Sequence, residues 1–111
     1  YGSVQNMAGE FVRASEASVT AAAAGAAAKM PADFRVSITN AEGKGVYPVS
    51  SFTWLLLYEN PKDKAQSKVM MDFVKWMLTD GQKFAGQLGY APLPDAVVTL
   101  ELAALARVKV G

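Results

Sequence analysis

The sequence contains neither cysteine nor histidine. Their absence excludes a disulfide framework, a thiol or imidazole nucleophile, and a metal site of the soft cysteine and histidine type. The commonest general base of enzymes is therefore missing as well. The ten acidic residues are scattered, with no two at a spacing that implies a shared site, and we interpret each as a surface charge. We expect no enzyme, no catalytic residue, no metal and no cofactor.

The chain also lacks an excess of either charge. Eleven basic and ten acidic residues leave a net charge of +1, so no basic stripe for nucleic acid is present. The three arginines, Arg13, Arg35 and Arg107, lie beside no recognisable anion-binding loop. No apolar run is long enough to span a membrane, because the nearest candidate is alanine-rich and Lys29 closes it. At 111 residues the chain fits one ordinary domain.

Two short strands are predicted at the start, over residues Gly2–Gln5 and Glu10–Arg13. Asn6 and Gly9 lie between them, and both residue types favour a tight turn. A two-stranded hairpin is only marginally stable alone, so we expect it to pack against another element.

An alanine-rich helix follows, with Ser15 as its predicted N-cap and Pro31 shortly after its end. Beyond it, apolar and polar residues alternate, which predicts a half-buried strand or extended segment; its apolar members are Phe34, Val36 and Ile38. The glycine-containing stretch Asn40–Gly45 lacks the pattern of a phosphate-binding loop and opens no helix, so we interpret it as a plain turn.

The longest apolar run is Thr53–Tyr58, between Pro48 and Pro61. It has no alternation and no charge, which is typical of a central strand buried on both faces. The chain contains few other strand candidates that could flank it.

Helices dominate the remainder. Residues 64–79 predict a helix that ends near Gly81 and whose apolar stripe faces the core; the stripe comprises Val69, Met70, Phe73, Val74 and Met77, with Trp76 at its side. A short helix through Phe84 and Leu88 and a last helix from about Pro94 to Val108 complete the prediction.

Four segments carry a family resemblance. They are "N-x-x-G-x-F-V" at residues 6–12, "YPVSSFTWLLLY" at 47–58, "DGQKF" at 80–84 and "LGYAPLP" at 88–94. In this order they resemble the C-terminal part of periplasmic phosphate-binding proteins, the substrate receptors of phosphate ABC transporters. The resemblance covers nearly the whole chain.

The resemblance implies an α/β fold: the C-terminal part of a two-lobed, type II-like periplasmic binding protein, with both lobes incomplete. Residues 1–44 would end the second lobe with the hairpin and the alanine-rich helix. Residues 45–52 would cross between the lobes, and residues 53–111 would end the first lobe with a strand and the C-terminal helices. Thr53–Tyr58 would then be a strand of a sheet whose other strands lie upstream of Tyr1.

The implied function is capture of inorganic phosphate for import, in the periplasm or elsewhere at the cell envelope, with the ABC transporter permease as partner. The family binds phosphate through hydroxyls, backbone N–H groups, an arginine and an acidic acceptor, on segments expected N-terminal to Tyr1. Its S-G-T loop has no match here. We therefore expect no phosphate ligand in these residues, and phosphate binding only together with the missing N-terminal portion.

Ser50, Ser51 and Thr53 lie near the crossover and are candidates to line the cleft, with ordinary strand-end hydrogen bonding as the alternative. The alternative function is a truncated homologue that acts as a structural or interaction module without binding an anion. In either case we expect the chain to self-associate or to pair with an N-terminal fragment, because the predicted strand lacks neighbours. The sequence leaves open whether it is a proteolytic fragment, a split chain or a short gene, and whether the anion is phosphate or another oxyanion.

Overall fold

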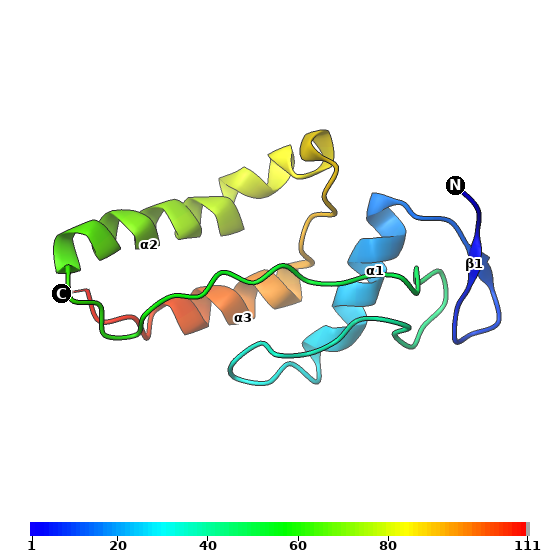
Figure 1. The fold of residues 1–111 in the computed structure, drawn as a ribbon, viewed down its shortest axis with the longest axis horizontal. Helices are drawn as coiled ribbons and strands as arrows, with labels where there is room; N and C mark the ends of the chain where they lie inside the picture. The colour runs from blue at the N-terminus through cyan, green and yellow to red at the C-terminus, as the bar shows by residue number, and fades with distance from the viewer. Residues whose placement is uncertain (111) are drawn as a thin grey trace.

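The computed structural model describes residues 1–110, which form an elongated molecule of 49 × 28 × 19 Å (Figure 1). A small hairpin lies at one end, helix α1 lies beside it, and two further helices lie side by side at the other end. In chain order the elements are β1 (Val4–Gln5), β2 (Phe11–Val12), α1 (Glu16–Ala27), α2 (Lys64–Leu78), the 3₁₀ helices η1 (Asp80–Phe84) and η2 (Gly86–Leu88), and α3 (Asp95–Leu105).

The N-terminal hairpin is confirmed. Strands β1 and β2 are antiparallel, with Val4 opposite Val12. The backbone N–H of Gly9 donates to the carbonyl of Asn6 over 3.0 Å, and Gly9 has a φ of 81°, which suits a residue without a Cβ. These two strands form the only sheet in the described part of the chain.

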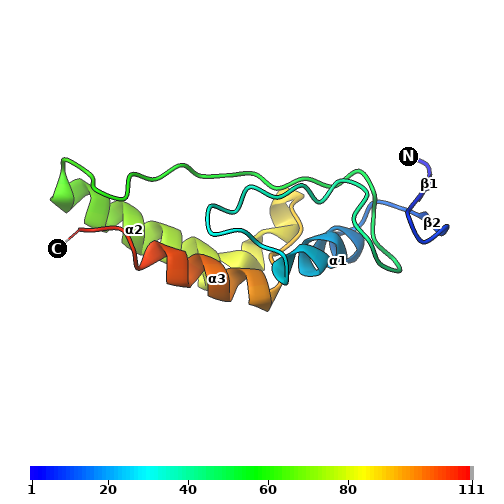
Figure 2. The same ribbon diagram turned by 90° about the horizontal axis from the view of Figure 1, so that it is seen from below.

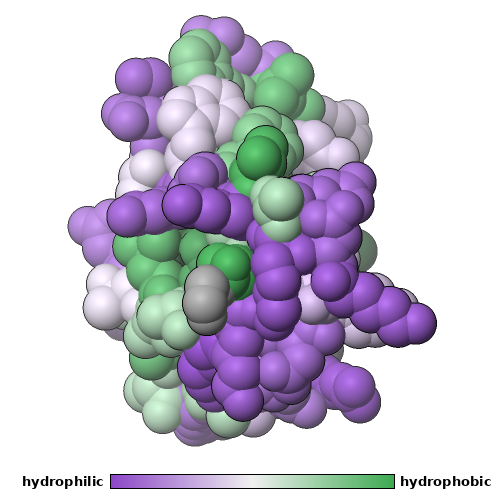
Figure 3. All heavy atoms as spheres, turned by 90° about the vertical axis from the view of Figure 1, so that its left-hand side faces the viewer, coloured by the Kyte–Doolittle hydropathy of each residue, from purple (hydrophilic) through white to green (hydrophobic). Residues whose placement is uncertain are grey.

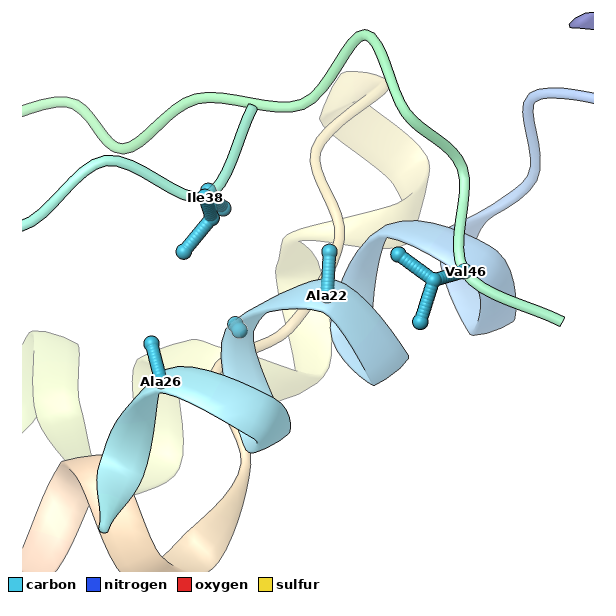
Figure 4. Close-up of a cluster of buried hydrophobic side chains, with 5 residues drawn as sticks. Ala22, Ala26, Ile38 and Val46 are labelled. Carbon is cyan, nitrogen blue, oxygen red and sulfur yellow. The ribbon is translucent and has the colours of Figure 1, made fainter. Parts of the chain in front are cut away.

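Helix α1 starts as its sequence predicts. The Ser15 hydroxyl accepts a hydrogen bond from the backbone N–H of Ser18, and the Ser18 hydroxyl accepts one from the backbone N–H of Ser15, a reciprocal capping box. The helix buries small side chains against two later segments, and this core consists of Ala22, Ala23, Ala26, Ile38 and Val46 (Figure 4). Small side chains let the backbone of these segments approach the helix closely.

The alternation after α1 is confirmed in burial but not in secondary structure. Phe34, Val36 and Ile38 are half-buried or buried, whereas the residues between them are exposed. No strand forms, however, and Phe34 has a φ of 60°, outside the extended range. The segment is instead held by single contacts to residues 48–54: the Asn40 N–H donates to the Pro48 carbonyl over 2.7 Å, and the Trp54 indole donates to the Phe34 carbonyl over 3.0 Å.

The predicted central strand Thr53–Tyr58 is wrong for this structure. The segment has no regular secondary structure and is exposed, with Leu56 92% and Tyr58 83% accessible. It runs as extended chain along one side of α2 and α3 (Figure 2). Because the described residues supply no neighbouring strand, its backbone groups have no ladder to join and its outer face has no cover.

The predicted buried face of α2 is also wrong in part. The helix buries Met71, Val74 and Leu78, whereas Phe73 is 54% exposed. The structure leaves three members of the predicted stripe outside the core: Val69, Met70 and Phe73. Helix α2 is apolar on more than one face, so its sequence pattern does not by itself select the one that packs against α3.

The end of α2 differs from its prediction in a second way. The helix ends at Leu78, and Gly81 lies inside η1 rather than acting as a left-handed stop. A Cβ at Gly81 would lie 3.0 Å from the Trp76 carbonyl oxygen, so close backbone approach explains the glycine. The left-handed residue is Gly89, with a φ of 77° at the end of η2. Helix α3 begins directly after Pro94, as predicted.

Candidate functional site

The predicted crossover, residues 45–52, is anchored to the hairpin and to α1. The Asn6 side-chain amide donates to the Val46 carbonyl over 3.1 Å, and the Tyr47 N–H donates to the Ser18 carbonyl over 3.1 Å. Asn6 is itself buried. Three elements distant in sequence are therefore joined at the start of the crossover.

Glu10 adds a charged contact to this junction. The Gly45 N–H donates to a Glu10 carboxylate oxygen over 2.6 Å, and the Asn6 amide reaches the same oxygen over 3.4 Å. Both hydrogen bonds lower the pKa of the Glu10 carboxyl, and the one from Gly45 has the larger effect. The Gly45 N–H of the glycine-containing loop thus donates to the protein's own carboxylate, which agrees with our interpretation of this loop as a plain turn.

The three predicted cleft residues lie on one continuous segment but differ in what their hydroxyls do. Ser50 is only 5% exposed and its hydroxyl donates to the Tyr47 carbonyl over 2.7 Å. The Ser51 hydroxyl donates to the Phe52 carbonyl over 3.1 Å from an exposed position, and Thr53 is exposed. Ser50 therefore stabilises the crossover locally, whereas Ser51 and Thr53 face solvent.

The arginines, which are the residues best suited to hold an anion, are each engaged with the chain itself. Arg13 donates to the Tyr1 carbonyl over 3.4 Å and Arg107 to the Ala32 carbonyl over 2.9 Å. Arg35 pairs with the Asp33 carboxylate at 3.5 Å. Within residues 1–110 no cluster of three or more acidic side chains is placed to hold a metal ion.

A pocket that the sequence did not indicate lies where α1 and α3 begin, next to η1 and η2. Its volume is about 580 Å³, and its lining consists of Glu16, Thr79, Gln82, Lys83, Gly86, Gln87, Pro92, Leu93, Asp95 and Val98. Two hydrogen bonds fix its wall: the Thr20 hydroxyl donates to the Pro92 carbonyl over 2.8 Å, and the Leu93 N–H donates to the Gln82 side-chain oxygen over 2.8 Å.

The charge of this pocket does not suit phosphate. It contains the carboxylates of Glu16 and Asp95, and its one ammonium, that of Lys83, lies 3.6 Å from the Asp80 carboxylate. An anion entering the pocket would meet uncompensated negative charge. At its wall, a Cβ added to Gly86 would lie 2.7 Å from the Glu16 carboxylate.

Comparison with known proteins identifies relatives over most of the chain. It is 42% identical over 98 residues, 88% of its length, to the phosphate-binding protein PstS of Xylella fastidiosa. It is 36% identical over 98 residues to the PstS of Pasteurella multocida, and 32% identical over an alignment covering 96% of the chain to that of Methanocaldococcus jannaschii. The chain spans 27% to 30% of the length of these relatives. No model of a known protein family matches it.

The chain is therefore homologous to PstS phosphate-binding proteins over most of its length, and the predicted resemblance is confirmed. The prediction that it is not an enzyme is confirmed by the same homology, since these relatives are binding proteins. The predicted fold is confirmed only in its coarser part: the chain corresponds to a piece of such a protein, and the described residues are mostly helical with one two-stranded sheet. No helix of residues 1–110 has the length and apolar character needed to cross a membrane.

Proposed function

We propose that this chain forms part of a substrate-binding protein that captures inorganic phosphate for import by an ABC transporter, in the periplasm or at the cell envelope. The observation that carries the proposal is the 42% identity to a phosphate-binding protein over 88% of the chain. The transporter permease would be the partner of the complete protein.

The chain would contribute to both lobes. Residues 1–44 would end the second lobe, residues 45–52 would form the crossover, and residues 53–111 would end the first lobe. In support, the apolar core around α1 draws on residues 22–46, whereas the buried residues of α2 and α3 are not among its members. The chain between this core and α2 passes along the molecule as a single extended segment (Figure 1).

The phosphate ligands would come from other segments of the complete protein. Within the described residues Arg35 pairs with Asp33, Arg13 and Arg107 each donate to a backbone carbonyl, the Ser50 hydroxyl donates to the Tyr47 carbonyl, and the 580 Å³ pocket holds two carboxylates. Ser51 and Thr53 have exposed positions and stay our candidates to line the cleft between the lobes.

A chimera tests the proposal. The residues of the Xylella fastidiosa PstS that align with this chain are replaced by the chain itself, and phosphate binding is measured by isothermal titration with the unmodified PstS as control. We expect the chimera to bind phosphate within about tenfold of the control, because the ligand-bearing segments are unchanged. A chimera that folds but does not bind would favour the alternative, a homologue that acts as an interaction module.

The isolated chain provides the second arm. We expect no phosphate binding by residues 1–111 alone in the micromolar range. A micromolar dissociation constant would show that the chain carries a complete anion site and would overturn our assignment of the ligands to other segments.

A further inference from the structure

All the polar groups of Asn6 form hydrogen bonds. Inside the hairpin its backbone N–H donates to the Glu10 carbonyl over 2.9 Å, its carbonyl accepts from the Gly9 N–H, and its side-chain oxygen accepts from the Glu10 N–H over 3.0 Å. Its side-chain NH₂ group donates to the carbonyl of Val46, forty residues away, over 3.1 Å. Because Asn6 is only 6% exposed, loss of this donor would leave a buried carbonyl unpaired. Asn6 is therefore both a turn residue and the link from the hairpin to the crossover.

Glu10 holds the residue that precedes Val46. Its carboxylate accepts a hydrogen bond from the Gly45 N–H over 2.6 Å. Gly45 has a φ of 68°, a backbone conformation that residues with a Cβ rarely adopt. The two hydrogen bonds from the hairpin to Gly45 and Val46, which we call the clamp, thus fix two adjacent residues of the crossover in an unusual conformation.

The rest of the crossover up to Ser50 is bonded to the same part of the chain. Three more hydrogen bonds join it to residues 1–44: the Tyr47 N–H to the Ser18 carbonyl, the Asn40 N–H to the Pro48 carbonyl, and the Thr39 hydroxyl to the Ser50 carbonyl. Within the described residues, 51–58 keep one hydrogen bond to residues 1–44, from the Trp54 indole. The chain then runs to the end of the molecule where α2 begins, whose surface shows apolar areas between hydrophilic ones (Figure 3). Residues 45–50 are therefore fixed to residues 1–44, with the clamp at their start.

We propose that Asn6 and Glu10 are positioning residues for phosphate binding by the complete protein, an inference that rests on the proposed function. Neither would touch the anion, because the Asn6 amide is engaged by the crossover and Glu10 is itself negative. They would act through Ser51 and Thr53, our candidates to line the cleft, which follow the clamped stretch within three residues. Release of the clamp would lower the fraction of molecules in which this stretch is placed for binding, and the apparent affinity falls with that fraction.

Asn6→Asp releases the clamp with almost no change of side-chain shape. The new carboxylate would face the Val46 carbonyl without a proton to donate and would lie beside the Glu10 carboxylate. In the chimera with the Xylella fastidiosa PstS, we expect the dissociation constant for phosphate at neutral pH to rise at least about tenfold, measured by isothermal titration.

Gln5→Glu is the matched control. It makes the same amide-to-acid change at the neighbouring residue of the hairpin, which is exposed and whose amide donates to the Gly9 carbonyl inside the hairpin. We expect its dissociation constant to stay within about twofold of the parent chimera. Hydrogen exchange of the Gly45 and Tyr47 amides should become faster in Asn6→Asp and stay unchanged in Gln5→Glu, while the helix amides keep their protection.

The pH dependence separates positioning from general damage to the fold. A protonated carboxyl at position 6 is again a donor toward the Val46 carbonyl, and the charged groups beside it are Glu10 and Lys44. The ratio of the dissociation constants of Asn6→Asp and the parent chimera should therefore shrink as the pH falls toward about 5. Each ratio is taken at one pH, because phosphate itself titrates.

The outcomes distinguish this inference from the proposed function. A parent chimera that does not bind phosphate would overturn the proposed function and this inference with it. A parent chimera that binds, together with an Asn6→Asp variant that binds as tightly as Gln5→Glu, would overturn the inference alone. A defect of Asn6→Asp that is equal at both pH values would show general damage to the fold and would also overturn it.

Discussion

Val97 provides the sharpest test of where the core of the helical end lies. It is fully buried, on the first turns of α3, which packs against both α1 and α2. Val97→Ala removes two buried carbon atoms, worth about 1.6 kcal/mol in transfer free energy, and leaves a cavity. We expect the free energy of unfolding to fall by about 2–3 kcal/mol.

Phe73→Ala is the informative comparison, because the sequence pattern alone placed Phe73 in the core. A buried phenylalanine would cost about 3–5 kcal/mol on truncation. In the structure the residue is 54% exposed, and its ring stacks on Trp76 with ring centres 5.9 Å apart. We expect a loss of only about 1 kcal/mol, because about half of the residue is already in water and alanine favours the helix.

Urea unfolding followed by circular dichroism measures both variants. The protein concentration is kept equal and low, since association makes apparent stability concentration-dependent. Truncation of the larger side chain, Phe73, should therefore lower the free energy of unfolding less than truncation of Val97. If Phe73→Ala proves the more destabilising of the two, the buried face of α2 assigned here is incorrect and the original sequence pattern was right.

Three further predictions concern single side chains. Ser15→Ala removes half of the capping box of α1 and should cost about 1 kcal/mol in a urea melt, while an unchanged midpoint would show that the cap does not stabilise the helix. Glu10 has a lowered pKa, so its contribution to stability is present above its ordinary pKa of 4.5 and is lost as the pH falls through the folded value. Glu10→Gln should therefore flatten the acid side of the melting temperature profile, and an unaltered profile would argue against the Gly45 contact. Burial raises the pKa of Glu101, so this group lowers stability as the pH rises above 4.5. Glu101→Gln should accordingly raise the melting temperature at pH 7 but not at pH 4, and equal shifts at both values would point to a cause other than ionisation.

Local chemistry allowed much of the secondary structure to be predicted from the sequence. The hairpin follows from Asn6 and Gly9, the start of α1 from Ser15, and the start of α3 from Pro94, because turns and helix caps depend on residues adjacent in the chain. The order of its motifs also pointed to the phosphate-binding proteins to which the chain is homologous.

The candidate cleft residues show that local chemistry does not determine burial. The sequence named Ser50, Ser51 and Thr53 together, but the structure separates a buried Ser50, bonded to Tyr47, from two exposed neighbours. The pocket between α1 and α3 had no signal in the sequence, because its walls come from segments more than sixty residues apart.

The apolar pattern by itself determined that Thr53–Tyr58 and α2 carry more apolar surface than one partner covers. Only the tertiary structure decided which part is covered: α2 packs against α3 and buries Val74, whereas Phe73 stays 54% exposed. It also decided that Thr53–Tyr58 is an open extended segment, since a strand exists only where a second backbone supplies its hydrogen bonds. Burial and strand pairing each depend on two surfaces. The sequence of one segment therefore indicates that a partner surface is required, but it does not identify that surface.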